Sequence, residues 1–281
     1  MVLSLKTIFD VAINIFGRYR NWYYNIFCYP EIKRMSKIVS WDKPKCHISF
    51  DIDGVEDIDQ LPRLLKILDK HDIKCSFAVV GHLIEKYPDI HKELVNRGHE
   101  LINHTYSHPD TGFVNLSSEQ IEAEIIRCEQ AMPEYEFQGF RIPHFGNQYT
   151  DKIYPVLKKL GYRYSSSTIA YQTPLAGFPY IVADCSGIWE FPLTCCPKHA
   201  RCIFDSSHAF RSKFARHTSK DFVWTFKRLV DKAIKNNMFL NIYLDPRDIV
   251  RFDFDWLLCY IKPKDNLDIV SLGGMVRWIK K

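Results

Sequence analysis

Two short groups of polar residues have the side chains and the spacing that a catalytic metal site needs. Asp51 and Asp53 are two residues apart, so both carboxylates point to the same side of an extended segment. His104 and His108 are four residues apart, which lets two imidazoles converge on one ion if the segment coils through a turn. Two histidines and one carboxylate leave coordination positions open, as a catalytic metal requires. Such an ion lowers the pKa of a bound water to about 7 and polarises a carbonyl oxygen, and a spare carboxylate accepts the proton of the water.

Either pair alone would be weak evidence for a metal site, because acidic doublets commonly end strands and single histidines are more often surface or hydrogen-bonded residues. In this chain both pairs follow short apolar runs, and both are followed by loop residues such as Gly54 and Pro109. The four residues are therefore predicted to lie at strand ends, where their side chains can meet.

The elements that must position these residues alternate along the chain. Strands are predicted at 46–50, 74–80, 100–103, 139–142, 162–165, 188–193, 239–244 and 267–271, and helices at 58–70, 82–97, 117–131, 150–160, 218–235, 253–261 and 275–280. Strand-helix alternation at this spacing indicates a parallel sheet with crossover helices. About seven such units favour a distorted (β/α) barrel over an open sheet, and in such barrels catalytic groups lie at the C-terminal ends of the strands.

The N-terminal region is predicted to be a separate helical extension, residues 1–40, before a single barrel domain at 41–281. Within 1–17 the polar residues Lys6, Asp10 and Asn14 form one stripe of an amphipathic helix that is too short and too charged to span a bilayer. We expect this helix to pack on the domain. The alternative is a helix lying on a membrane surface, which the aromatic and basic residues at 18–24 support.

Composition narrows the functional classes. Hydrophobic residues make up 46% of the 281 residues and charged residues 25%, as is usual for a globular protein. The net charge of +5, with no run of Lys and Arg, gives no support to nucleic acid as a partner. Nine irregularly spaced cysteines favour a reducing interior, and no secretory cleavage pattern is present, so we expect a cytoplasmic protein, alternatively peripheral at the inner membrane face.

Four segments resemble a known family. Residues 49–54 (SFDIDG), 104–109 (HTYSHP) and 140–143 (FRIP) are similar to three motifs of the polysaccharide deacetylases, carbohydrate esterase family 4, and residues 188–192 (IWEFP) are more loosely similar to a fourth. The resemblance covers about 46–271. It implies that Asp51 is the general base, that Asp53, His104 and His108 bind the metal, and that Arg141 pairs with Asp51 and holds it ionised. A purely structural ion pair would place Arg141 in the same position.

The resemblance also implies a substrate groove. Its walls would be formed by Pro143, His144 and Phe145 on one side and by Trp189 on another, and the backbone N–H of Tyr106 would stabilise the developing oxyanion.

One position departs from the family pattern. Where the last motif usually supplies a histidine as general acid, this chain has Asp245. An aspartate with an ordinary pKa of about 3.9 is a poor acid at neutral pH unless its surroundings raise that pKa. Asp245 is therefore either a shifted acid, a group that recognises the substrate, or a cap of the turn before Pro246. His144 or His208 could donate the proton in its place.

These features predict a metal-dependent hydrolase that removes an N-acyl group, acetyl in the first instance, from an amino sugar in a glycan precursor or polysaccharide. The alternatives are a deformylase or a cyclic-amide hydrolase of the same superfamily, and a catalytically silent carbohydrate-binding relative. Zinc is the expected metal, although two histidines and an aspartate also accept cobalt, nickel or iron. The sequence does not define the oligomeric state.

Overall fold

The strands form one curled sheet. The computed structural model describes residues 24–39, 41–145, 150–170, 173, 176–185, 187–199, 202–213, 216–262 and 266–279. Its strands are β1 (Lys45–Ile52), β2 (Ser76–Val79), β3 (Glu100–Asn103), β4 (Gly139–Phe140), β5 (Tyr164–Ser165), β6 (Tyr180–Ile181), β7 (Trp189–Glu190), β8 (Phe239–Leu244) and β9 (Asp268–Ile269). Their order is β6-β7-β5-β4-β3-β2-β1-β8, with β9 paired to the start of β1. Among the strands of the described residues, every pairing is parallel except that of β6 with β7.

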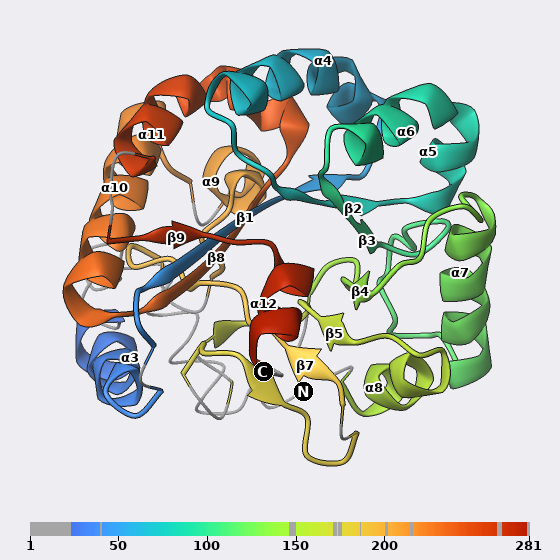
Figure 1. Cartoon of the computed structure of the whole chain (residues 1–281), viewed down its shortest axis with the longest axis horizontal. Coiled ribbons are helices and arrows are strands. Elements are labelled where there is room, and N and C mark those ends of the chain that lie inside the picture. The colour runs from blue at the N-terminus through green and yellow to red at the C-terminus, as the bar shows by residue number, and fades with distance from the viewer. Residues whose placement is uncertain are drawn as a thin grey trace.

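The sheet curls until the segment after β7 meets β8. The Thr194 N–H donates to the Asn241 carbonyl oxygen over 2.9 Å, and the Asn241 N–H donates to Thr194 Oγ1 over 2.9 Å. The strands surround α12 (Leu272–Ile279), and the other helices lie outside them (Figure 1). The predicted distorted (β/α) barrel is confirmed.

The helices follow the predicted alternation. They are η2 (Tyr24–Cys28), α3 (Tyr29–Ser36), α4 (Val55–Lys70), α5 (Gly81–Lys86), α6 (Pro88–Asn96), α7 (Ser118–Gln130), α8 (Thr150–Lys159), α9 (Ser206–Arg211), α10 (Ser219–Asn236), η5 (Pro246–Arg251) and α11 (Phe254–Ile261), besides α12. The single helix predicted at 82–97 is wrong: Pro88 keeps Tyr87 out of the helical region, so the segment forms two helices. Ser117 forms a capping box at the start of α7, because its Oγ accepts from the Gln120 N–H and its N–H donates to Gln120 Oε1.

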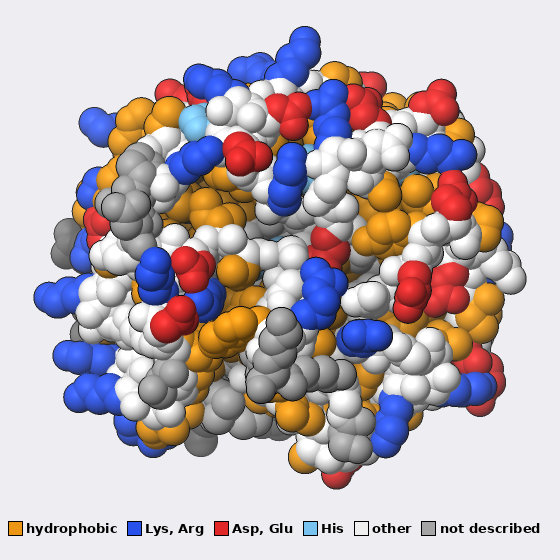
Figure 2. All heavy atoms as spheres, viewed as in Figure 1, with side chains coloured by type: hydrophobic (Ala, Val, Ile, Leu, Met, Phe, Trp, Pro, Cys, Tyr) orange, Lys and Arg blue, Asp and Glu red, His pale blue; other side chains and the backbone are white. Residues whose placement is uncertain are grey.

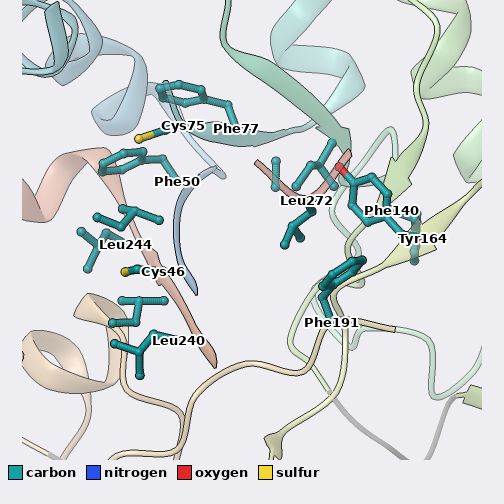
Figure 3. Packing of buried hydrophobic residues seen from close by; sticks show 14 of the residues in the cluster. Cys46, Phe50, Cys75, Phe77, Phe140, Tyr164, Phe191, Leu240, Leu244 and Leu272 are labelled. Atoms are coloured by element: carbon teal, nitrogen blue, oxygen red, sulfur yellow. The ribbon is translucent and has the colours of Figure 1, made fainter. Parts of the chain in front are cut away.

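The apolar core lies largely between the strands and the outer helices. On β1, Phe50 stacks on Phe77 of β2 and meets Phe254 of α11 edge to face, with ring centroids 5.3 Å and 5.7 Å apart. Figure 3 shows a second group, in which Tyr164 and Phe191 lie on one side of Leu272 at the start of α12. Burying these rings stabilises the barrel and closes the space between the strands and α12.

The barrel interior is polar. Alternation along β1 turns His47, Ser49 and Asp51 away from the helices, and all three are almost completely buried. Arg141 donates to Ser49 Oγ over 2.8 Å, and the Asn241 side chain donates to Ser166 Oγ over 2.9 Å. Buried polar groups need such partners, so this hydrogen-bonded network fixes the floor on which the candidate site rests.

The N-terminal helix predicted within 1–17 lies outside the described residues. The neighbouring elements η2 and α3 pack on α10, where Lys232 lies 4.2 Å from the Tyr29 ring centroid and the Asn236 side chain donates to the Tyr29 hydroxyl over 2.9 Å. The domain boundary at residue 40 stays a prediction. Within the part of the chain that the structure describes, no helix has both the length and the apolar character to cross a membrane.

Candidate active site

A cavity of about 490 Å³ opens at the C-terminal ends of the strands. Its wall contains seven of the residues predicted to act in catalysis, metal binding or substrate binding, and others that were not assigned a role. The lining residues are Asp51, Asp53, His104, His108, His144, Phe145, Ile169, Cys202, Ile203, Ser207, His208, Arg211, Tyr243 and Asp245. The location agrees with the rule that parallel barrels carry their chemistry at this end.

Asp53, His104 and His108 converge on one point of the cavity. The Nε2 atoms of His104 and His108 lie 3.4 Å and 3.5 Å from Asp53 Oδ1. Tetrahedral coordination of zinc places oxygen and nitrogen ligands about 3.4 Å apart, as calculated from ordinary bond lengths. The Asp53 side chain is 27% exposed, so the point where the three groups meet is open to the cavity.

A tight turn after β3 brings the two histidines together. Thr105 and His108 have φ angles of 70° and 51°, in the left-handed region, so the chain coils between them. Asn103 Oδ1 accepts from the Thr105 N–H over 2.9 Å, and Thr105 Oγ1 accepts from the His108 N–H over 3.1 Å. These two bonds offset the cost of the unusual backbone and fix the spacing of the imidazoles.

The surroundings of the histidines fix their protonation. The Nδ1–H of His104 donates to the Arg141 carbonyl oxygen over 2.8 Å, which leaves Nε2 to face Asp53. Burial and the neighbouring His104 lower the pKa of His108 to about 4, so His108 is neutral at physiological pH, as a metal ligand must be. Burial would raise the pKa of Asp53, but the close imidazole of His104, followed by that of His108, outweighs it and lowers that pKa.

Asp51 lies below this point and has different contacts. It is 2% exposed, and its Oδ1 accepts from Arg141, which is fully buried and also donates to Ser49 and Ser166. Burial raises the pKa of the Asp51 carboxyl, while the Arg141 charge opposes the shift. The predicted Asp51–Arg141 pair is present, and it holds a carboxylate with raised proton affinity close to His104 Nε2, 4.0 Å away.

The loop that carries Asp53 is held by a residue that sequence reasoning missed. Asp57, fully buried in the first turn of α4, accepts through Oδ2 from the backbone N–H groups of Asp53 and Gly54, both over 3.1 Å. Arg247 of η5 donates to both Asp57 oxygens. The Gly54 position before a helix, with an acid three residues later, is a capping signal that could have identified Asp57.

The opposite wall of the cavity comes from α9. His208 Nδ1 lies 2.7 Å from Oδ2 of Asp205, which caps α9 and is 1% exposed. The Asp205 charge raises the pKa of His208, whereas burial opposes the increase. Arg211, one turn later, forms ion pairs with Asp245 and Asp248.

Tyr243 connects the two sides of the cavity. It lies two residues before Asp245, on the same side of β8, and its ring centroid is 4.8 Å from that of Phe145. Burial raises the pKa of Tyr243, and the charges of Asp205, Asp51 and Asp53 add to the increase. The His208–Asp205 pair and the Asp51–Asp53 pair therefore act on one enclosed space.

Three residues predicted to bind substrate do not line the cavity. The Tyr106 hydroxyl donates to Glu85 of α5 over 2.8 Å, and Arg127 of α7 lies over its ring. Glu190 points toward α8, where its Oε2 accepts from the Tyr154 hydroxyl over 3.2 Å, and its neighbour Trp189 is not among the residues of the cavity wall. Pro143 is buried but absent from the cavity wall, unlike His144 and Phe145. The side chains of Tyr106, Trp189 and Pro143 therefore do not line this cavity, and the role predicted for the Tyr106 backbone N–H stays a prediction.

The residues present fit a bound divalent cation. Asp53 Oδ1 is buried and has no hydrogen-bond partner among the described residues, although two imidazole nitrogens face it. A buried carboxylate oxygen that faces two imidazole nitrogens without a well-formed hydrogen bond is costly without a cation and favourable with one. Asp53, His104 and His108 would hold the ion.

Residues 40–165 match the family model described as polysaccharide deacetylase. This part of the chain is therefore similar to the polysaccharide deacetylase family. The matched region contains the three candidate metal ligands, Asp53, His104 and His108, and the buried ion pair of Asp51 and Arg141.

Curated relatives are similar to this chain over part of their length. A peptidoglycan-N-acetylglucosamine deacetylase of Bacillus cereus is 34% identical over 88 residues, which is 31% of this chain and 31% of that protein. The chain spans less than half the length of the first curated relatives it matches.

Solved structures share the fold over most of the chain. A Mycobacterium smegmatis protein assigned to the polysaccharide deacetylases has a TM-score of 0.72 at 16% identity, covering 86% of this chain and 92% of that one. The allantoinase Puue has a TM-score of 0.68 at 14% identity, covering 83% and 89%. At these identities the likeness is one of fold.

Proposed function

We propose that this protein is a metal-dependent amide hydrolase that removes an acetyl group from the nitrogen of an amino sugar in a glycan or glycan precursor. The observation that carries the proposal is the convergence of Asp53, His104 and His108 beside the buried Asp51–Arg141 pair. The family match of residues 40–165 and the B. cereus relative's name support the acetylated amino sugar as the substrate class.

A divalent cation, zinc in the first instance, would supply Lewis-acid polarisation of the amide carbonyl and acidify a water molecule. The proton transfers of the reaction are carried out by side chains of the protein. Asp51 accepts the proton of the attacking water, for which its burial and its ion pair with Arg141 are suited, because the first raises its proton affinity and the second keeps it ionised. The new C–O bond forms at the acetyl carbon, and the C–N bond then breaks.

The leaving nitrogen needs a proton, and we assign its donation to His208. Asp245 is ion-paired with Arg211, which favours the ionised carboxylate, and an ionised carboxylate has no proton to give. His208 faces the same cavity, its side chain is 42% exposed, and Asp205 favours its protonated form. A histidine of this kind carries the proton at neutral pH that Asp245 lacks.

Acetate release from defined substrates tests the proposal. The zinc- or cobalt-loaded chain is incubated with chitooligosaccharides, peptidoglycan fragments and N-acetylated sugar nucleotides, and acetate and free amine are measured together. We expect equal amounts of both from at least one class, and neither from Asp51→Asn loaded with the same metal. Tight sugar binding without release of acetate or formate would replace the enzyme with a silent carbohydrate-binding protein, while formate alone from N-formyl sugars would make it a deformylase.

A further inference from the structure

A second group of metal-ligating side chains lies outside the candidate active site. Cys196, His199 and His217 are buried, with exposures of 3%, 3% and 4%. Cys196 Sγ lies 3.5 Å from His199 Nδ1 and 3.4 Å from His217 Nε2, and the two imidazole rings meet edge to face with centroids 4.5 Å apart. The three ligand atoms thus face one another in the protein interior.

The separations match those around a zinc ion. With ordinary Zn–S and Zn–N bond lengths and tetrahedral angles, a thiolate sulfur and an imidazole nitrogen on one ion lie about 3.6 Å apart. Direct thiol–imidazole hydrogen bonds alone would be weak, since a thiol is a poor donor and acceptor. A mixed thiolate and imidazole set is the one that zinc prefers over magnesium or calcium.

We propose that Cys196, His199 and His217 bind a zinc ion, separate from the cation at Asp53, His104 and His108. The fourth position belongs to a water molecule or to Cys202, whose carbonyl oxygen accepts the Cys196 N–H across the same hairpin over 2.8 Å. A buried site with few open positions is typical of a structural metal.

The position of the site suggests what the ion stabilises. Cys196 and His199 belong to a hairpin in which Cys195 pairs with Ile203, and His217 precedes Thr218, the N-cap of α10. Cys196 and His217 are 21 residues apart, and α9, with His208 and Arg211, lies between them. The His217 N–H also donates to the Ala209 carbonyl oxygen over 2.7 Å. A metal here closes the loop that carries α9 and holds it against the cavity.

Another cysteine–histidine cluster does not satisfy the same conditions. Cys259, on the surface, lies 3.9 Å from His71 Nε2, and that nitrogen is already 2.6 Å from Asp255. Lys70 also pairs with Asp255, so this carboxylate is engaged by two partners. Cys259 therefore serves as the control for cysteine ligation.

Cobalt spectroscopy tests the proposal independently of activity. The metal-free chain is titrated with Co²⁺ under reducing conditions, and near-ultraviolet absorption is followed for thiolate-to-cobalt charge transfer. The catalytic set contains no thiol, so this band reports only cysteine ligation. We expect two cobalt ions per chain, the band in wild type, and its loss together with one ion in Cys196→Ala. Cys259→Ala and Cys195→Ala should keep both ions and the band.

The two metal sites can fail separately. His104→Ala should lose one ion and activity but keep the thiolate band, which leaves the second site testable in a chain whose hairpin is untouched. Wild-type protein that binds cobalt without the band would overturn the proposal, as would a band that survives in Cys196→Ala or disappears in Cys259→Ala. If Cys196→Ala does not fold, His199→Asn should weaken cobalt binding at the thiolate site at least tenfold, and unchanged affinity would contradict the assignment.

Discussion

Asp51 and Asp53 stand two residues apart at one strand end, but their carboxylates contact different groups. Asp51 is held by Arg141 and is almost fully buried, whereas Asp53 faces His104 and His108 at the edge of the cavity. The alternation of a strand puts both on one side, and their different contacts are the basis on which we propose Asp51 as the proton acceptor and Asp53 as a metal ligand.

This separation predicts opposite results for two substitutions. Asp51→Asn should bind zinc with wild-type stoichiometry and lower kcat by about 10²- to 10⁴-fold, the usual contribution of a general base. His104→Ala should lose both the catalytic zinc and activity, because it removes a ligand. Metal content and kcat measured on the same preparations decide the matter, with the exposed Asp59→Asn as the control expected to match wild type. Equal loss of metal in both active-site variants would contradict the division of roles.

The pH profile distinguishes His208 from Asp245 as proton donor. Activity should fall at alkaline pH as the donor loses its proton. Asp205 raises the pKa of His208, so Asp205→Asn lowers that pKa and should move the alkaline limb of kcat/KM to lower pH. His208→Gln should remove this limb and lower kcat by about 10²-fold.

The Asp245→Asn variant is the matched comparison. If His208 donates the proton, Asp245→Asn keeps the alkaline limb in place, because the Asp205–His208 pair is intact. An alkaline limb that vanishes in Asp245→Asn but not in His208→Gln would return the role to Asp245.

At the scale of elements, the start of α4 couples the metal loop to η5. Asp57 binds the Asp53 and Gly54 N–H groups, and Arg247 donates to Asp57. Asp57→Asn should therefore lower zinc affinity at the catalytic site about tenfold, as losses behind a metal ligand commonly do. Competition titration with a chromophoric chelator measures this. Glu56→Gln, a change at the exposed neighbour, should leave affinity unchanged, and equal affinities in the two variants would contradict the coupling.

The strand ends that carry Asp51, Asp53, His104 and His108 could be predicted because each follows an apolar run and precedes turn residues. The same pattern located β8, which matches its predicted range of 239–244. Helix ends with Gly or Ser capping signals were also predictable. Pro88 is a local signal for a helix boundary as well, and the prediction of one helix at 82–97 overlooked it.

The wall formed by α9 was not predictable as an element. The helix has only six residues, too few for an apolar stripe, and its partners are distant along the chain: Arg211 and Asp245 are 34 residues apart. The side chains of Trp189 and Tyr106 lie away from the cavity for a related reason, because the family motif gives their positions in the sequence but not the direction in which each side chain points.

At the scale of the molecule, the barrel places a polar interior beneath the site and an apolar layer outside. Arg141 links Ser49 and Asp51 of β1 to Ser166 beyond β5, so one network spans the barrel. On the face in Figure 2, Lys and Arg side chains are interspersed with Asp and Glu, and such a mixed surface gives no directional attraction for a polyanion. Cellular location and the division at residue 40 stay predictions.

The buried histidine of the barrel interior makes whole-molecule stability depend on pH. Burial lowers the pKa of His47 to about 3, although its hydrogen bond to the Val270 carbonyl oxygen opposes the shift. In the unfolded chain the pKa of a histidine is about 6.5, so below that pH the unfolded state binds more protons than the folded state. The free energy of unfolding therefore decreases as the pH is lowered from about 6.5 to about 3.

We therefore expect the urea midpoint of the metal-free chain to decrease from pH 7 to pH 4.5, with His47 contributing at most about 1.4 kcal/mol per pH unit to the free energy of unfolding. His47→Asn should reduce the slope by this contribution over the same range. Because the substitution also removes packing, the difference measured at pH 8 gives the packing loss, and only the change of slope reports titration. Parallel pH dependences in the two proteins would mean that His47 is protonated in the folded state.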